Sequence, residues 1–509
     1  MVAHVNTFGL SGINGFFVDA EINLSKGLPV LDIIGMGNLA VREAADRIRA
    51  AIENMEFPFP LGRITVNLAP AGIRKEGTCY DLAIAVGILK CVGSVKGRTE
   101  TFGFIGELSL DGFLRPVPGV LSMVREASLR GIRNCVVPLE NADEAALVES
   151  CRIYPASCLK EAAEILENGR NAWKNRNPYA ARQNKYGDFS EVKGQEQAVR
   201  AAEIAAAGGH NMILIGAPGC GKTMIASRLP GILPELTREE ALEVAPVYSA
   251  RNLLRKDGIL MREAPFRTAY PDSTKAGLIG GGPRPVPGEI SLAHKGILFL
   301  DELAEFDRSV MQSLRQPMES GRISISRCGE CMEFPADFLL VAAANPCKCG
   351  KLLEGRGTCS CTALQARNYL SRISKPILDR IDLHVPVRRI PFQNQEYRQT
   401  ESTETIRRRV IAAREFQKYR YRNESVCLNG KMHGAMVKRY CKLDASSEAL
   451  LKAAADTAGT SMRGYDKILK TARTIADLEL RERITESDTA EAIQYRFLDS
   501  YFQEAAEWK

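Results

Sequence analysis

The spacing of hydrophobic and polar positions first sets apart residues 1–165. There, strand-like runs of apolar residues alternate with amphipathic helical runs. The strand-like runs are 16–22, 64–68 and 135–137, and the helical runs are 41–55, 81–91 and 119–129. This mixture predicts a compact α/β domain over residues 1–165.

Three further regions follow with different patterns. Residues 166–187 lose the hydrophobic periodicity and are rich in Asn, Arg and Lys, which predicts a linker. From 188 to 390, apolar strand candidates alternate with helices, the pattern of a parallel sheet flanked by helices. From 391 to 509 the pattern is helical, and residues 485–488 match a capping box for the last helix. We therefore expect an α/β protein of three domains, 1–165, 188–390 and 391–509.

Composition and charge narrow the class of protein only slightly. A hydrophobic content of 45% and a charged content of 25% are ordinary for a soluble protein. The longest apolar run, 338–344, is far shorter than the roughly 20 residues of a membrane span, and no secretory signal is visible. We therefore expect a cytoplasmic protein without a membrane partner. The net charge of +7 does not by itself indicate nucleic acid.

A glycine-rich stretch follows the apolar run 212–215. Its sequence, GAPGCGKT, matches the phosphate-binding loop pattern G-x-x-x-x-G-K-T between a strand and a helix. Glycines let backbone N–H groups turn toward phosphates, and the helix N-terminus adds positive potential. An accidental glycine-rich turn is the alternative, which the flanking strand and helix oppose. The predicted nucleotide-binding residues are Gly216, Ala217, Pro218, Gly219, Cys220, Gly221, Lys222 and Thr223.

Polar residues end two later strands of the same predicted sheet. The run 296–300 ends in Asp301 and Glu302, and the run 338–344 ends at Asn345. Because ligands collect at the carboxyl ends of parallel strands, these side chains are expected beside the phosphate loop. We expect Asp301 to position Mg²⁺, Glu302 to polarise the attacking water, and Asn345 to hydrogen-bond the γ-phosphate and that water.

Two arginines are candidates for contacts to phosphate from outside the loop. Arg380 stands between apolar anchors and, if unpaired, could project to the γ-phosphate of a neighbouring subunit as an arginine finger. The alternative is an ordinary ion pair with Asp379 or Asp382. Arg463 is the third residue of the sequence Ser-Met-Arg-Gly, which opens a helix in the last region, and it could contact phosphate from there.

In this order, the motifs GAPGCGKT, ILFLDEL, AAANPCKCG, ILDRIDL and SMRGY resemble those of the Mg-chelatase-like branch of the AAA+ ATPases. Over nearly its whole length the chain is similar to the bacterial ComM/YifB family. The resemblance implies a P-loop core with a helical lid, ATP and Mg²⁺ as cofactors, and a hexameric ring that moves on DNA. It also implies a helicase in branch migration during recombination or natural transformation, with recombination proteins as partners. The implied roles are phosphate binding for Lys222, Mg²⁺ binding for Thr223 and Asp301, hydrolysis for Glu302, sensing for Asn345 and Arg463, and an arginine finger for Arg380.

Residues 1–165 resemble the proteolytic domain of Lon proteases, which has a ribosomal protein S5 domain 2-like fold. The resemblance rests on segments 74–81 and 106–119. An active Lon site needs a serine nucleophile in the first segment and a lysine base just after the second. By register, these positions are Cys79 and Leu121. Without a nearby base a thiol stays mostly protonated, so we predict a non-proteolytic domain reused for binding or assembly.

Two loops fit the same branch of ATPases. Residues 276–289 resemble an insert that lines the central pore of the ring. Residues 322–327 and 332–334 alternate like the strands of a β-hairpin, and in the family such hairpins point into the pore. Plain surface loops are the alternative for both segments.

The loop 347–361, just after Asn345, is rich in cysteine. It contains two C-x-C pairs, separated by nine residues. The first pair is Cys347 and Cys349, and the second is Cys359 and Cys361. Four thiolates at this spacing can close a tetrahedral zinc site with Zn–S distances of about 2.3 Å. Such a site would be structural, because all four ligand positions would be filled. Free thiols or a labile disulfide are the alternatives, since C-x-C is tighter than the usual C-x₂-C.

Three functions are therefore compared. The leading hypothesis is a ring-forming AAA+ ATPase that acts on single-stranded or branched DNA as a helicase. The second is a chelatase-type ATPase that remodels a protein partner, which the Lon-like domain opposes. The third is an ATP-dependent peptidase, which Leu121 opposes.

Overall fold

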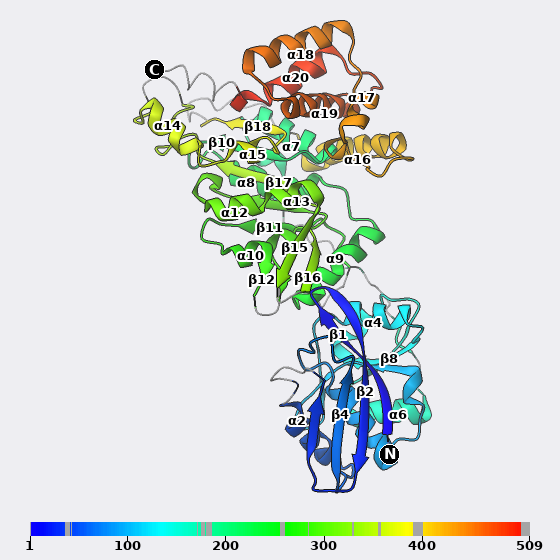
Figure 1. Cartoon of the computed structure of the whole chain (residues 1–509). Coiled ribbons are helices and arrows are strands. Elements are labelled where there is room, and N and C mark those ends of the chain that lie inside the picture. The colour runs from blue at the N-terminus through cyan, green and yellow to red at the C-terminus, as the bar shows by residue number, and fades with distance from the viewer. Residues whose placement is uncertain are drawn as a thin grey trace.

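The structure of the chain is a computed structural model. It describes residues 2–35, 41, 43–169, 172–174, 179, 186–254, 260–282, 285–327, 330–354, 358–389 and 401–499. Three parts lie one above another in Figure 1: an N-terminal α/β domain, a central sheet with its helices, and a C-terminal helical bundle. The expected fold class, mixed α/β with a parallel sheet flanked by helices and a helical C-terminal part, is confirmed. The predicted linker 166–187 begins too early, because residues 166–168 are the last of helix α6; residues 170–171, 175–178 and 180–185 lie outside the described residues.

A seven-stranded sheet forms the N-terminal domain, in the order β3-β4-β2-β1-β5-β8-β9. Its strands are β1 Val2–Ser11, β2 Asn14–Ser25, β3 Leu31–Ile34, β4 Arg63–Ala69, β5 Phe102–Phe104, β8 Asn134–Pro138 and β9 Arg152–Ala156. Its helices are α2 Ala44–Asn54, α3 Asp81–Val92, α4 Val120–Leu129, α5 Ala142–Ala145 and α6 Leu159–Asn168. The short strands β6 Glu107–Leu108 and β7 Leu114–Arg115 pair with each other.

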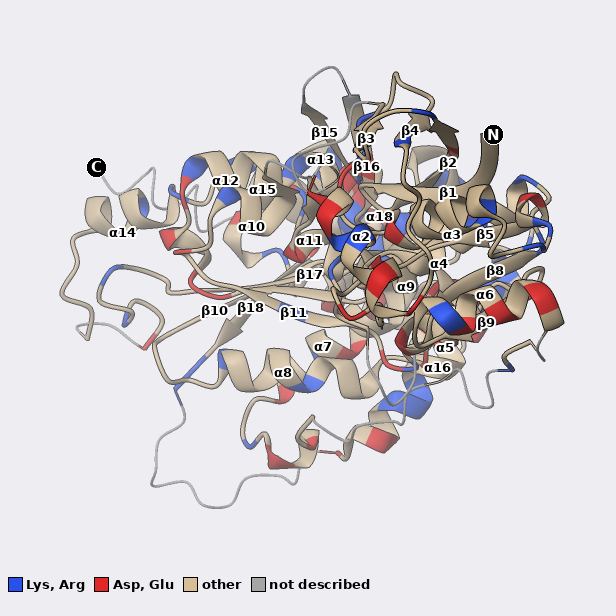
Figure 2. Ribbon diagram, turned by 90° about the horizontal axis from the view of Figure 1, so that it is seen from below, with Lys and Arg blue, Asp and Glu red and all other residues tan. Residues whose placement is uncertain are grey.

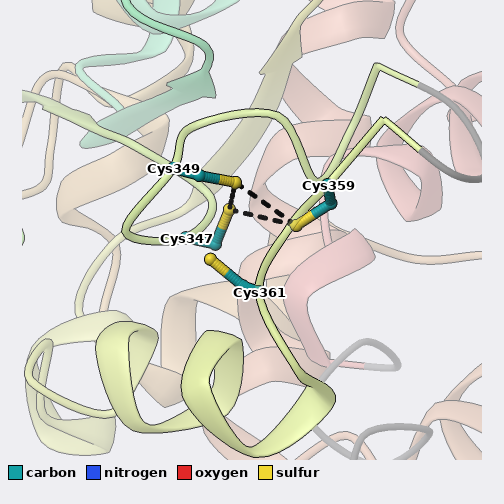
Figure 3. Close-up of side chains that lie close together, drawn as sticks. All are labelled: Cys347, Cys349, Cys359 and Cys361. Carbon is teal, nitrogen blue, oxygen red and sulfur yellow. Dashed lines mark hydrogen bonds between the residues drawn. The ribbon is translucent and has the colours of Figure 1, made fainter.

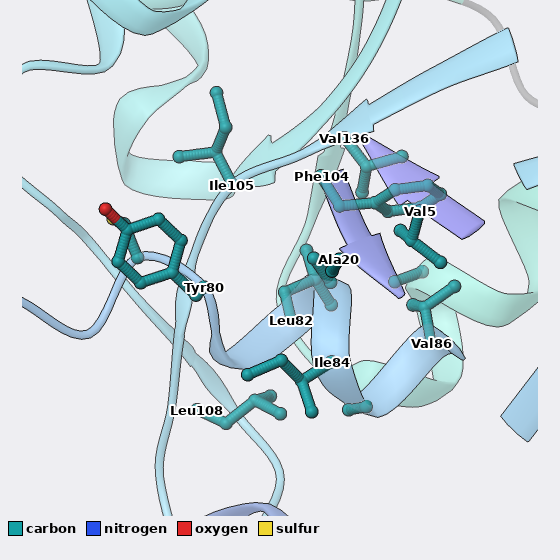
Figure 4. Packing of buried hydrophobic residues seen from close by; sticks show 14 of the residues in the cluster. Val5, Ala20, Tyr80, Leu82, Ile84, Val86, Phe104, Ile105, Leu108 and Val136 are labelled. Atoms are coloured by element: carbon teal, nitrogen blue, oxygen red, sulfur yellow. The ribbon is translucent and has the colours of Figure 1, made fainter. Parts of the chain in front are cut away.

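Helix α3 is the centre of this domain's core. It is apolar on nearly every side, so it is buried almost throughout rather than along one stripe. Leu82 and Val86 of α3 share one hydrophobic cluster with Val5 of β1, Ala20 of β2 and Phe104 of β5 (Figure 4). The helix therefore holds the centre of the sheet, and Cys79 stands just before its first turn.

The central sheet has five parallel strands in the order β11-β14-β17-β10-β18. The strands are β10 Met212–Gly216, β11 Phe266–Ala269, β14 Ile297–Leu300, β17 Leu339–Ala344 and β18 Leu383–Val387. Helices cover both faces, which explains the continuous apolar runs in the sequence (Figure 2). One face carries α7 Glu196–Gly208 and α8 Lys222–Ile232; the other carries α10 Lys275–Ile279, α11 Glu289–Leu292, α12 Arg308–Ser313 and α15 Lys375–Leu378.

After β10, the chain crosses to the edge strand β11 and returns through β14 and β17, which lies beside β10. The last strand, β18, then pairs on the other side of β10. The strand order thus reverses at β10, and ligands bind at the carboxyl edge of such sheets where the order reverses. The loop after β10 is the glycine-rich stretch singled out in the sequence.

Two segments of the central part extend toward the N-terminal domain (Figure 1). The predicted hairpin is confirmed as the antiparallel pair β15 Arg322–Arg327 and β16 Glu330–Pro335. The other segment, 276–289, contains most of α10 and the short pair β12 Gly280–Gly281 and β13 Val286–Pro287. Residues 283–284 and 328–329, inside these segments, lie outside the described residues.

The C-terminal part is helical, as predicted. Its helices are α16 Thr403–Arg420, α17 Gly434–Tyr440, α18 Ala445–Ala458, α19 Met462–Leu478 and α20 Glu486–Gln494. The predicted capping box is confirmed, because the Thr485 N–H donates to Asp488 Oδ2 at 2.8 Å. Among the helices that the structure describes, none combines the length and the apolar character that a membrane crossing needs.

Candidate nucleotide-binding site

The glycine-rich loop joins β10 to α8 with a tightly constrained backbone. Gly219 and Gly221 have φ angles of +75° and +98°, in the left-handed region that favours glycine. At Gly216, an added Cβ would lie 2.1 Å from the carbonyl oxygen of Val387. The loop therefore requires glycine at these three positions: twice for conformation and once for the close approach of β18.

The ammonium of Lys222 lies inside this loop. Its Nζ donates to the carbonyl oxygens of Gly216 at 2.7 Å and Ala217 at 2.9 Å, and to Asn345 Oδ1 at 3.1 Å. Burial lowers the pKa of Lys222 from its usual value. Asn345 follows β17, the neighbour of β10, so the parallel sheet itself brings these two side chains together.

Asp301 and Glu302 follow β14, one strand further along the sheet. The Thr223 hydroxyl donates to Asp301 Oδ2 at 3.1 Å, so two oxygen donors of the kind that Mg²⁺ prefers stand side by side. Glu302 has a φ of +52°, a conformation uncommon outside glycine, and its N–H donates to Asp301 Oδ1 at 2.9 Å. The strained residue thereby orients the preceding carboxylate.

Two further residues contact this site without any local sequence signal. Gln195, buried just before α7, donates to the carbonyl oxygens of Arg388 at 2.7 Å and Cys220 at 3.4 Å. Tyr369, on α14 Ala363–Leu370, hydrogen-bonds the Asn345 amide, and burial raises the pKa of its hydroxyl to about 12. Both lie far in sequence from the groups they contact, so pattern alone did not find them.

Arg380 lies at the opposite end of the sheet from the phosphate loop of its own chain. It stands three residues before β18, which pairs in parallel with β10 from Met212 and Leu383 onward. Asn211 Nδ2 donates to the Arg380 carbonyl at 3.1 Å, which places Arg380 beside the start of β10. The five residues of β10 separate the two ends, by roughly 16 Å at about 3.3 Å per residue.

The guanidinium of Arg380 is paired, but with neither predicted acid. It forms an ion pair with Glu319 of α13 Arg315–Ser320 and donates to the Pro376 carbonyl at 2.6 Å. Asp382 instead accepts from Lys467 of α19 at 2.6 Å. The predicted ion pair with Asp379 or Asp382 is therefore wrong: the partner is Glu319, which α13 brings to the guanidinium.

Arg463 is exposed on the first turn of α19, whose cap is Ser461. Lys467 follows one turn later on the same side of the helix and binds Asp382, just before β18. The start of α19 also lies against Arg496, which donates to the Ile381 carbonyl at 2.7 Å. Arg463 and Arg380 thus share the amino end of the sheet, away from their own phosphate loop.

Cys79 and Leu121, the residues at the positions of the two Lon catalytic groups, are both buried. The Cys79 thiol donates to the Phe8 carbonyl at 3.5 Å, and burial raises its pKa to about 12. Leu121 packs with Ala241 and Ala245 of α9 Arg238–Ala250, in the central part of the chain. The place of a lysine base is therefore occupied by a hydrophobic contact between domains.

The four loop cysteines point toward one another (Figure 3). The Sγ–Sγ distances are 3.4 Å for Cys347–Cys349, 3.6 Å for Cys347–Cys359 and 3.4 Å for Cys349–Cys359, and all four Sγ atoms, that of Cys361 included, lie within 4.8 Å of one another. A tetrahedral zinc ion with Zn–S bonds of about 2.3 Å holds its sulfurs roughly 3.8 Å apart. The pKa of Cys349 falls to about 5, chiefly because the Lys351 amide donates to its sulfur. The geometry fits a metal site.

Comparison with known proteins matches all three parts of the chain. Three family models match in order: "Subunit ChlI of Mg-chelatase" over residues 20–141, "Magnesium chelatase, subunit ChlI" over 188–395, and "Magnesium chelatase, subunit ChlI C-terminal" over 400–496. The protein YifB of Salmonella typhimurium is 42% identical over 98% of this chain and 97% of its own length. The competence protein ComM of Haemophilus influenzae is 40% identical over 95% of both chains. Since such identities extend over nearly whole chains, this chain belongs to the ComM/YifB family of Mg-chelatase-like AAA+ proteins.

Proposed function

We propose that the chain is an ATP-hydrolysing motor that assembles into a hexameric ring in the cytoplasm and moves on DNA. The observation that carries the proposal is the division of the candidate site between the two ends of the central sheet. Lys222, Thr223, Asp301 and Asn345 converge at the carboxyl end, while Arg380 and Arg463 stand at the amino end. A complete site then needs a second copy of the chain.

Each residue at the carboxyl end has a role that its contacts support. Lys222 binds the β- and γ-phosphates of ATP, and Thr223 and Asp301 hold the Mg²⁺ that neutralises phosphate charge. Glu302 accepts a proton from the attacking water. Asn345, already joined to the Lys222 ammonium, orients that water toward the γ-phosphate. Hydrogen bonds join Lys222 to Asn345 and Thr223 to Asp301 at this end of the sheet, and Glu302 directly follows Asp301.

The residues at the amino end complete the site of a neighbour. Arg380 and Arg463 lie at the other end of β10 from their own phosphate loop, which supports a role at the site of another subunit. In a ring, the amino end of one sheet faces the phosphate loop of the next subunit, so both arginines act in trans. Glu319 holds the Arg380 guanidinium in a defined position within its own chain.

DNA is the substrate that the family relationship favours. The H. influenzae relative is named a competence protein, and the β15–β16 hairpin extends from the central part of the chain. We propose that this hairpin and segment 276–289 line the pore, and that the motor is a helicase in branch migration that works with recombination proteins. A chelatase-type ATPase that remodels a protein partner is the second candidate, which the magnesium chelatase family models favour.

We further propose that Cys347, Cys349, Cys359 and Cys361 hold one Zn²⁺ ion. The ion would act structurally, since four thiolates fill its coordination sphere. The N-terminal domain, for which we keep the limits 1–165, acts in binding or assembly rather than proteolysis, because Cys79 and Leu121 are both buried.

The test is the ATPase rate with and without single-stranded and forked DNA, together with a strand-displacement assay. We expect DNA to stimulate hydrolysis and forked DNA to be unwound. The Glu302→Gln variant controls for a contaminating ATPase. Hydrolysis that DNA never stimulates, with no displacement, would favour the protein-remodelling candidate.

A further inference from the structure

The cysteine loop lies directly against the phosphate loop. Gly350, between the first two and last two cysteines, has a φ of +78°, and a Cβ built on it would lie 2.4 Å from Pro218 Cδ and 3.2 Å from Pro218 Cγ. The backbone at Gly350 therefore touches the Pro218 ring with no space for a side chain. Pro218 is the third residue of the glycine-rich loop.

Two further observations place the same segments close together. Cys347 is fully buried and comes two residues after Asn345, whose amide oxygen accepts a hydrogen bond from the Lys222 ammonium. Glu354, later in the cysteine loop, lies near enough to Cys220 for its charge to add to the effect of burial in raising the pKa of that thiol. The cysteine loop thus touches the phosphate loop at Pro218, and its first cysteine follows closely on the residue that binds Lys222.

A metal ion would change the stiffness of this contact. Four sulfurs within 4.8 Å of one another repel strongly when they are ionised, because each thiolate carries a negative charge. A divalent cation would offset that repulsion and tie the two C-x-C pairs together, so that Gly350, next to Cys349, would lose conformational freedom. Gly350 lies between those pairs, and it transmits this rigidity to Pro218.

We propose that the metal-bound cysteine cluster is a positioning element for the phosphate loop, so that metal occupancy sets the affinity of the chain for ATP. The inference rests on the proposed nucleotide and zinc sites. It adds that the cluster supports the ATP site through the contact between Gly350 and Pro218.

The first experiment changes the contact and leaves the cysteines intact. In Gly350→Ala, the added methyl group displaces Pro218, and we expect the dissociation constant of a fluorescent non-hydrolysable ATP analogue to rise tenfold or more. Gly131→Ala is the matched control, because Gly131 has a φ of +81° and a Cβ there meets no atom within 4 Å. Both variants suffer the same backbone strain, but only the first pushes on the phosphate loop. Unchanged affinity in Gly350→Ala, with folding confirmed by circular dichroism, overturns the proposal.

The second experiment removes the metal. A Cys349→Ser/Cys359→Ser variant, and wild-type protein treated with a zinc-selective chelator in excess Mg²⁺, should both lose affinity for the analogue, and added Zn²⁺ should restore it only in the wild type. Metal-free protein that binds the analogue as tightly as untreated protein also overturns the proposal.

Failures of the two underlying proposals are read separately. Purified wild-type protein without zinc refutes the zinc site, whatever Gly350→Ala does. Equal analogue affinity in wild type and Lys222→Ala refutes the nucleotide site itself.

Discussion

The Lys222 ammonium donates a 3.1 Å hydrogen bond to the Asn345 amide oxygen across 123 residues of sequence. The bond joins the helix after β10 to the end of β17, and Tyr369 approaches the same amide. Two side chains, Lys222 and Tyr369, therefore orient the Asn345 amide without any contribution from a bound nucleotide. A neutral amide at this place can contact both the ammonium and an anionic phosphate.

Replacement of Asn345 should separate the binding of ATP from its hydrolysis. In Asn345→Ala, Lys222 keeps its two carbonyl partners, so we expect near-normal ATP affinity with hydrolysis lowered about 10²-fold. Asn345→Asp keeps the shape but adds a negative charge beside the γ-phosphate, and it should weaken ATP binding as well. Equilibrium binding and steady-state ATPase rates distinguish the two. Normal hydrolysis in Asn345→Ala would show that the amide does not act on the water.

Substitutions of Lys222 and of Glu302 should affect different steps, ATP binding in the first case and ATP hydrolysis in the second. Lys222→Ala should abolish ATP binding, because the main cation at the β- and γ-phosphates is removed. Glu302→Gln should retain binding, trap ATP and stabilise the ring, because only the proton acceptor is lost. Nucleotide retention and mass measurements check both outcomes. A wild-type rate of hydrolysis in Glu302→Gln would refute its catalytic role.

Arg380 should act on the ATP of a neighbouring subunit. Arg380→Ala should bind ATP normally yet hydrolyse it slowly, since arginine fingers contribute as much as 10³–10⁵-fold in rate. Mixed rings with Lys222→Ala subunits should recover some activity, because each Lys222→Ala subunit still presents its own Arg380 to an intact site. The measurement is the ATPase rate against mixing ratio, with mixed rings confirmed by mass.

Glu319 provides the control for Arg380. Its carboxylate pairs with the guanidinium inside one chain, so Glu319→Gln should reduce hydrolysis far less than Arg380→Ala does. Equal losses in both variants, or no recovery at any mixing ratio, would mean that Arg380 serves only the structure of its own subunit.

Cys79 should be chemically inert in the folded chain. Because burial raises its pKa to about 12, almost none of it is thiolate at pH 8, and an alkylating reagent should label it only after unfolding. Cys427 is exposed and serves as the internal control, expected to be labelled at once. Mass spectrometry of peptides after timed alkylation reads both sites. Rapid labelling of Cys79 would contradict the prediction of an inert thiol and would favour the peptidase alternative.

Leu121→Lys should not restore proteolysis, although it returns a lysine to the position of the Lon base. Its side chain would enter the apolar contact with Ala241 and Ala245, where an ammonium loses its water of hydration. We expect a domain contact weakened by a few kcal/mol, seen as earlier unfolding of the N-terminal domain, and no peptide cleavage. Leu121→Met is the conservative control.

The sequence alone determined the features that lie within contiguous segments. The phosphate loop, the acids after β14, the hairpin and the capping box each combine chemistry and spacing over a few residues. Local backbone preference and burial pattern decide such elements, so they were recognised before any fold was known. The paired C-x-C motifs belong to the same class, and the structure brought their four sulfurs together.

The tertiary structure decided which distant groups meet. Glu319 rather than Asp379 or Asp382 pairs with Arg380, Gln195 reaches the phosphate loop, and Gly350 touches Pro218. Each of these contacts joins segments that approach only when the strands assemble in the order β11-β14-β17-β10-β18 and the helices pack on them. Long-range packing fixes such distances, and no periodicity along the chain carries that information.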